Sequence, residues 1–154
     1  MAWTTPRTWG AGEKPSASTL NTHIRDNFAA IGDAWTSYTP TLGNATLGNG
    51  TLSAAYIQAG KLVQFRIKFV LGSTSAITGA VTFTLPVNAT AARTMTVPAV
   101  FNDASGPFKI GVGYNSSTSV LAFRDDASAA ISSTSPFTWA TSDEIFVSGS
   151  YEAA

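Results

Sequence analysis

The 154-residue sequence contains no cysteine and only one histidine. Without cysteine, a disulfide framework and a thiolate metal site are both excluded. Secreted cellular domains of this size more often carry disulfides, so the composition is also atypical of that class. A chain of this length is large enough for one domain with a real core and small for two.

Charged residues are scarce, at 12% of the chain, and nine basic side chains balance nine acidic ones. A nucleic-acid partner needs a concentrated Lys/Arg surface, so this balance argues against one. Thr, Ser, Ala, Gly and Asn are abundant where Lys and Glu are usual. Such an uncharged polar surface is typical of proteins that work outside cells, in assemblies, or both.

Long apolar runs are also lacking. No stretch approaches the roughly 20 residues that a membrane span needs. The first residues, MAWTTPRTWGAGEKP, lack the charged start and apolar run of a signal peptide. We therefore expect a protein that is made in the cytoplasm and does not insert into a membrane.

The clearest pattern that is present is a strict alternation in residues 62–71, where Val63, Phe65, Ile67 and Phe69 share one face. Successive side chains of a strand point to opposite sides of a sheet, so this segment predicts a strand with one apolar face. Turn residues flank the segment on both sides, and the alternation resumes in residues 81–85. Together the strands of this region predict an antiparallel meander with one buried face.

Further short alternating segments follow. The segment 95–101 contains Pro98, which predicts an edge strand or a bulge. Residues 110–114 and 120–124 flank a polar turn and predict a hairpin, and residues 144–151 predict the last strand. Seven or eight short strands predict an all-β fold, either an antiparallel β-sandwich or a jelly-roll-like barrel. Its predicted core consists of Val63, Phe65, Ile67, Phe69, Val81, Phe83, Leu85, Ile145 and Val147.

The N-terminal part has a different character. Residues 1–15 lack any period and predict an extended arm. Trp3 and Trp9 in this arm have large apolar surfaces that need a partner. They either fold back on their own domain or dock into a neighbouring subunit or another protein, and both alternatives are open.

A helix is predicted for residues 17–31, capped by Ser16 or Ser18. It is marginal alone, so we expect it to pack on something through its one narrow apolar stripe. The chain is thus divided into an N-terminal anchor, residues 1–35, and a β-domain, residues 36–154. The stripe consists of Leu20, Ile24, Phe28 and Ile31.

Residues with catalytic or metal-binding chemistry are few and scattered. His23 lies on the helix away from the apolar stripe, where a solvated or capping role is expected. No nucleophile elbow and no phosphate-binding glycine loop is present. The carboxylates fall mainly in turns, although oxygen ligands at Asp103, Asp125 and Asp126 leave a calcium site open. We therefore predict that the protein is not an enzyme and has no catalytic residue, cofactor or required metal.

Aromatic side chains are the remaining candidates for binding, because their faces can stack on sugar rings. Two of them, Tyr56 and Trp139, lie on alternating core faces and are expected to pack in the core. The full set of candidates is Tyr38, Tyr56, Tyr114, Trp139 and Tyr151.

Two regions of the sequence carry motifs that point to a family. The first, TTPRTWGAGEKPSASTLNTHIRDNFAAIGDAW, resembles the N-terminal segment of small virion proteins of tailed bacteriophages, where a T-P-R-T-W arm precedes an L-N-T-H-I-R-D-N helix. The second comprises YTPTLGNATLGNGTLSAAYIQAGKLVQFRIKFVLG and the closing PFTWATSDEIFVSGSYEA. It is similar to the β-domains of phage tail-fibre and minor tail proteins.

This resemblance implies a non-enzymatic virion structural protein that forms a homo-oligomer, expected to be a trimer. It implies a tail-tip or short-fibre protein whose anchor contacts other virion proteins and whose β-domain faces the host surface, with a host glycan as a further candidate partner. Because no shaft separates the helix from the β-domain, a capsid decoration protein that clamps capsomers stays open, and a carbohydrate-binding module is a third alternative. The anchor residues are Trp3, Trp9, Leu20, Ile24, Phe28 and Ile31.

Overall fold

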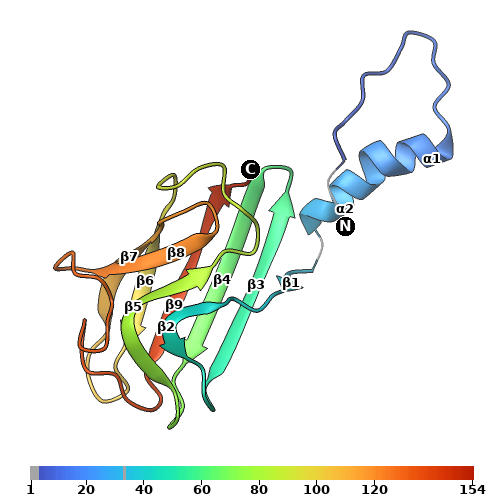
Figure 1. Ribbon diagram of the computed structural model, residues 1–154. Helices are drawn as coiled ribbons and strands as arrows, with labels where there is room; N and C mark the ends of the chain where they lie inside the picture. Colours follow the sequence, from blue (N-terminus) through green and yellow to red (C-terminus); the bar gives the residue numbers. More distant parts are fainter. Residues whose placement is uncertain (1–3, 33) are drawn as a thin grey trace.

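The computed structural model describes residues 4–32 and 34–154, and Figure 1 shows a curled β-sheet from which a helical stretch projects. Trp3 lies outside these residues. Within them, nine strands form a single sheet. The strands are β1 (Thr36–Ser37), β2 (Leu42–Thr46), β3 (Thr51–Ala59), β4 (Leu62–Val70), β5 (Ala76–Thr84), β6 (Thr96–Asn102), β7 (Lys109–Asn115), β8 (Val120–Asp125) and β9 (Glu144–Glu152).

Neighbouring strands are antiparallel, in the order β1-β3-β4-β9-β6-β7-β8-β5-β2. The sheet curls so that strands from its two halves face each other across the core. For example, the ring centroids of Phe69 on β4 and Phe83 on β5 are 6.4 Å apart. The predicted all-β fold, preceded by one short helix, is confirmed.

The core consists of the inward side chains of these strands, and each predicted core residue is at most 7% exposed. Phe123 joins the two halves, because its ring lies edge-on to Phe83 at 5.1 Å and to Phe101 at 6.2 Å. Edge-on contacts of this kind are favoured between aromatic rings. Ile131, in the loop between β8 and β9, is also fully buried, although strand periodicity gives no signal for it.

The predicted meander is wrong in its third strand. β3 and β4 pair as expected, but β4 pairs on its other side with β9, and β5 pairs with β8 and β2. The loop between β4 and β5 therefore crosses from one half of the curled sheet to the other. Both strands keep their apolar faces inward, and periodicity alone cannot distinguish pairing side by side from packing face to face.

The edge position predicted from Pro98 is also wrong, because β6 lies between β9 and β7. Pro98 lies opposite Val112 on β7, whereas the pairing of β6 with β9 begins one residue later, at Ala99. Proline lacks the N–H that a sheet ladder needs. It is tolerated here because the ladder with β9 does not extend to it.

The helical stretch runs from Ala17 to Gly32 in three segments: α1 (Ala17–Leu20), a π-helical turn η1 (Asn21–Arg25) and α2 (Asp26–Gly32). Ser16 is the N-cap, since its side chain accepts a hydrogen bond from the backbone N–H of Thr19. No helix within residues 4–32 and 34–154 is long and apolar enough to cross a membrane.

Candidate assembly surfaces

The residues that the helical stretch buries are Asn27 and Ala30. Asn27 is 5% exposed because its side chain is clasped by the start of the arm. Its amide nitrogen donates to the Thr4 and His23 carbonyls at 2.7 and 3.2 Å, and its oxygen accepts from the Thr4 N–H at 2.9 Å. The His23 ring nitrogen Nδ1 lies 3.3 Å from the Thr5 carbonyl. These contacts hold the arm along one side of the helix.

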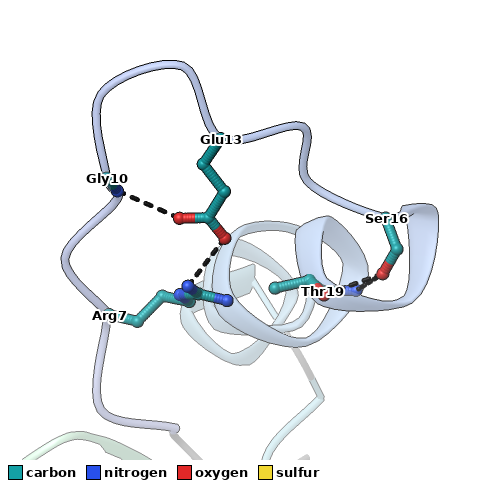
Figure 2. A network of polar contacts seen from close by, with 5 residues as sticks. All are labelled: Arg7, Gly10, Glu13, Ser16 and Thr19. Carbon is teal, nitrogen blue, oxygen red and sulfur yellow. Dashed lines mark hydrogen bonds and ion pairs between the residues drawn. The ribbon is translucent and has the colours of Figure 1, made fainter.

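Between these contacts and the helix, the arm forms a loop with its own polar contacts (Figure 2). The Arg7 guanidinium and the Glu13 carboxylate form an ion pair of 2.7 Å, and the same carboxylate accepts the N–H of Gly10 at 3.0 Å. Arg7 also lies over the ring of Trp9, 4.8 Å from its centroid. Trp9 is nonetheless 36% exposed, so much of its surface is available to a partner.

The apolar stripe of the helix, called the helix stripe below, is exposed. Leu20 is 38%, Ile24 43%, Phe28 72% and Ile31 57% exposed. A surface helix usually turns such a stripe to the core, and this helix does the reverse. Only its α2 end lies against the sheet, at β3, while the remainder projects away from it (Figure 1).

The π-helical turn helps to keep the helix stripe straight. In an α-helix a step of four residues overshoots one turn by about 40°, so two such steps would tilt the stripe around the axis. In η1 the Asp26 N–H donates to the carbonyl of Asn21, five residues back. Because this turn is wider, the step from Leu20 to Ile24 overshoots less. The exposed side chains consequently stay on one side.

A second apolar surface lies on β7, whose alternation is inverted. Gly111 and Gly113 face the core, while Ile110 and Val112 point outward and are 67% and 41% exposed. The rings of the core leave no room for side chains here. A Cβ atom on Gly111 would lie 2.8 Å from the ring of Phe101.

The outward residues of β7 continue a row of apolar side chains across β6 and β9. Val100 lies opposite both Ile110 and Phe146, and Pro98 lies opposite Val112. Residues directly opposite each other share one face of the sheet. Phe108, just before β7, is 67% exposed. We call this surface, formed by Pro98, Val100, Phe108, Ile110, Val112 and Phe146, the sheet patch.

An open groove of ≈ 610 Å³ borders the sheet patch, with Pro98, Val100 and Phe146 in its lining. Arg66 and Lys68 of β4 line it as well. Both cations are already engaged: Arg66 lies 4.7 Å from the ring centroid of Trp35, and Lys68 pairs with Glu144 at 2.9 Å. The groove thus presents an apolar floor whose adjoining charges are largely satisfied.

The sheet patch was not recognised from sequence. Ile110 and Val112 alternate as a core strand does, so nothing in their own spacing indicates an outward face. The residues between them carry the signal, because a strand face made of Gly111 and Gly113 contributes little to a core.

The solvated or capping role expected for His23 considers the helix alone. It does not predict that the His23 ring lies near the Thr5 carbonyl.

Three of the aromatic candidates for ligand binding serve packing instead. Tyr56 and Trp139 pack against the core, and the Trp139 indole donates to the Ser132 carbonyl at 2.8 Å. The Tyr151 hydroxyl donates to the Val87 carbonyl at 2.6 Å, and burial raises the pKa of Tyr151 to about 12.

The two other candidates differ in their surroundings. Tyr114 lies between the guanidinium groups of Arg93 and Arg124, each 5.8 Å from its ring centroid. Tyr38 packs edge-on against Tyr56, and burial raises the pKa of the Tyr38 hydroxyl well above its ordinary value. Among residues 4–32 and 34–154, that hydroxyl is the single buried side-chain polar atom without a hydrogen-bond partner.

The carboxylates stabilise turns. Asp143 is buried and accepts backbone N–H groups of Ala104 and Ala140 at 2.9 and 2.6 Å. Hydrogen bonds from Ser105 lower the pKa of Asp103, and a hydrogen bond from Ser135 lowers that of Asp125. No group of three or more potential metal ligands occurs in the part of the chain that the structure describes, so the calcium alternative is not supported.

Comparison with known proteins identifies no relative: no family model, no curated protein and no solved structure matches the chain. Function is therefore inferred from the exposed surfaces, together with the expectation drawn from the sequence alone. The helix stripe, the sheet patch and Trp9 are the candidate assembly surfaces. All three are apolar, and none of them carries a set of reactive groups.

Proposed function

We propose that the chain is a non-enzymatic structural protein of a tailed bacteriophage virion, made in the host cytoplasm. It works as a homo-oligomer at the tail tip or in a short fibre. The N-terminal arm and helix attach it to other virion proteins, and the β-domain faces outward toward the host surface. The observation that carries this proposal is the exposure of the helix stripe on a helix that buries Asn27 and Ala30 instead.

The physical reason lies in the cost of leaving apolar surface in water, about 25 cal/mol for each Å². A stripe of four large side chains, with Phe28 72% exposed, is unfavourable unless a partner covers it. The helix is also too short to be stable by itself, so contacts with the arm and with a partner must hold it. A segment of this kind is what an assembly anchor requires.

A second placement, as a capsid decoration protein, is favoured by the short connection between helix and sheet. Helix α2 ends at Gly32 and β1 begins at Thr36, which leaves no room for a fibre shaft. The carbohydrate-binding alternative is disfavoured, because Tyr56, Trp139 and Tyr151 pack in or against the core.

The anchor is tested by Trp9→Ala in the phage that encodes the chain. We expect the variant protein to fold normally and to be missing from purified particles, because the exposed indole is lost from the attachment surface. Quantitative mass spectrometry of the particles measures incorporation, and Thr8→Ala is the matched control. Normal incorporation of Trp9→Ala would contradict the anchor. Immunogold labelling of wild-type particles then separates tail from head placement.

A further inference from the structure

We propose that the helix stripe of one chain docks on the sheet patch of a second copy of the same chain. This inference rests on the proposed function, in which the protein is a homo-oligomer, and it specifies the contact between subunits. Each chain then gives its helix to one neighbour and receives a helix from another. Trp9, on the arm, is left free for other virion proteins.

The two surfaces of one chain do not meet in the structure. Helix α2 lies against β3, whereas the sheet patch is centred on β6 and β7. In the sheet order β3-β4-β9-β6-β7, four strand spacings separate β3 from β7, or about 19 Å. The two surfaces of one chain are therefore apart in the structure. We place the partner of each surface on another molecule.

The two surfaces match in size. The helix stripe extends over eleven residue steps, from Leu20 to Ile31, or about 16 Å along the helix. The sheet patch crosses the three strands β9, β6 and β7, about 10 Å, and its residues 108–112 extend about 13 Å along β7. The adjoining groove of ≈ 610 Å³ gives room for a large side chain such as Phe28 at the margin of the patch.

The surfaces also match in character and area. Both consist of uncharged side chains, and the three cations that border the patch, Arg66, Lys68 and Arg124, already have intrachain partners. From the exposed fractions, each surface offers the equivalent of about two large side chains, or roughly 400 Å². One such contact buries about 800 Å² in total, half the area of a standard stable interface, and in a closed ring every chain makes two of these contacts.

A contact between two different surfaces is heterologous, and it forms a ring when the rotation between subunits closes. Such a contact can be tested by mixing two single-surface variants. Phe28→Lys disables the helix stripe and keeps the sheet patch, while Ile110→Lys does the opposite. Phe28 is 72% exposed and Ile110 is 67% exposed, so we expect the fold to tolerate both changes. Thr22→Lys on the helix and Ser150→Lys on β9 are matched controls at exposed positions outside both surfaces.

The readout is molar mass in solution by light scattering, with circular dichroism to verify the fold. We expect the wild type and both controls to form a closed oligomer and each variant alone to be a monomer. An equimolar mixture should give a 1:1 dimer, because it contains one working pair of surfaces. Nothing larger should form from that mixture.

Three results would overturn the docking. If Phe28→Lys is monomeric while Ile110→Lys still oligomerises, the helices bundle with one another. If Ile110→Lys is monomeric while Phe28→Lys still oligomerises, the sheet patches pair with one another. If both are monomeric and their mixture stays monomeric, the two surfaces do not bind each other. In these cases the wild-type oligomer still forms and the proposed function stands. A monomeric wild type at high micromolar concentration would instead overturn both the docking and the homo-oligomer in the proposed function.

Discussion

Strands β4 and β7 belong to the same sheet and alternate equally well, yet they orient their apolar side chains oppositely. In β4 the apolar side chains Phe65 and Phe69 are fully buried. In β7 the glycines face the core, and Ile110 and Val112 face outward. Alternation therefore defines which residues share a face, while the side chains and backbone of the adjacent strands decide which face is inside. The N-terminal helix is a second case in which the apolar side faces outward, because it buries Asn27 and exposes Phe28.

The largest expected difference between the two strands is in stability. Phe65→Ala removes a fully buried ring from β4 and should lower the free energy of unfolding by about 3–5 kcal/mol. Ile110→Ala in β7 is the matched change, and in a monomeric background such as Phe28→Lys it should cost less than about 0.5 kcal/mol. Urea denaturation measures both values. A loss below roughly 1 kcal/mol for Phe65→Ala would mean that its face is not the inner one.

A smaller effect tests why β7 is inverted. Gly111→Ala places a methyl group against the Phe101 ring and the Arg124 backbone, so we expect a loss of about 1–3 kcal/mol from overpacking. Gly32→Ala is the control, since a Cβ atom there meets nothing within 4 Å. Equal midpoints of urea denaturation for the two variants would show that the space over Gly111 is not limiting.

The tyrosines on the β4 side of the core predict a loss of stability at high pH. Burial raises the pKa of Tyr151 to about 12, and it raises that of Tyr38 further. As the pH rises through about 10, the tyrosines of the unfolded chain lose their protons while these two keep theirs. The folded state then binds more protons than the unfolded state, so stability falls between pH 10 and 12 and beyond.

Urea denaturation across this pH range measures the effect, with Tyr38→Phe as the matched variant. The Tyr38 hydroxyl has no hydrogen-bond partner among the described residues, so its removal should leave stability near pH 7 almost unchanged. The loss of stability above pH 10 should be smaller in the variant than in the wild type. An identical alkaline profile would mean that Tyr38 titrates normally in the folded protein.

Much of the β-domain could be predicted from local patterns. The alternation around Phe65 and Phe83 gave the inward faces of β4 and β5, and the polar turn after Asn115 gave the pairing of β7 with β8. The position of β5 could not be predicted in this way, because a loop that crosses between halves of the sheet looks like a hairpin loop in sequence. The edge position predicted from Pro98 was wrong for a related reason, since local chemistry does not show where the hydrogen-bonded ladder with a neighbouring strand ends.

The candidate surfaces were predicted in part. The four residues of the helix stripe follow from helical spacing, and the need for a partner follows from the shortness of the helix. Their exposure does not, because it depends on the arm returning to clasp Asn27 through Thr4. The sheet patch could not be placed from the sequence, since it depends on the pairing of β6 with β9, which is far away in the chain.

The sequence by itself determined the all-β class, the positions of the strands, and the small number of reactive side chains, because these depend on residue type and local spacing. Only the tertiary structure decided which apolar surfaces are buried and which stay exposed. That outcome depends on contacts between strands, such as the ring of Phe101 on β6 against Gly111 on β7. Where large side chains of adjacent strands already fill the core, β7 contributes only glycine there, and its own apolar residues point outward.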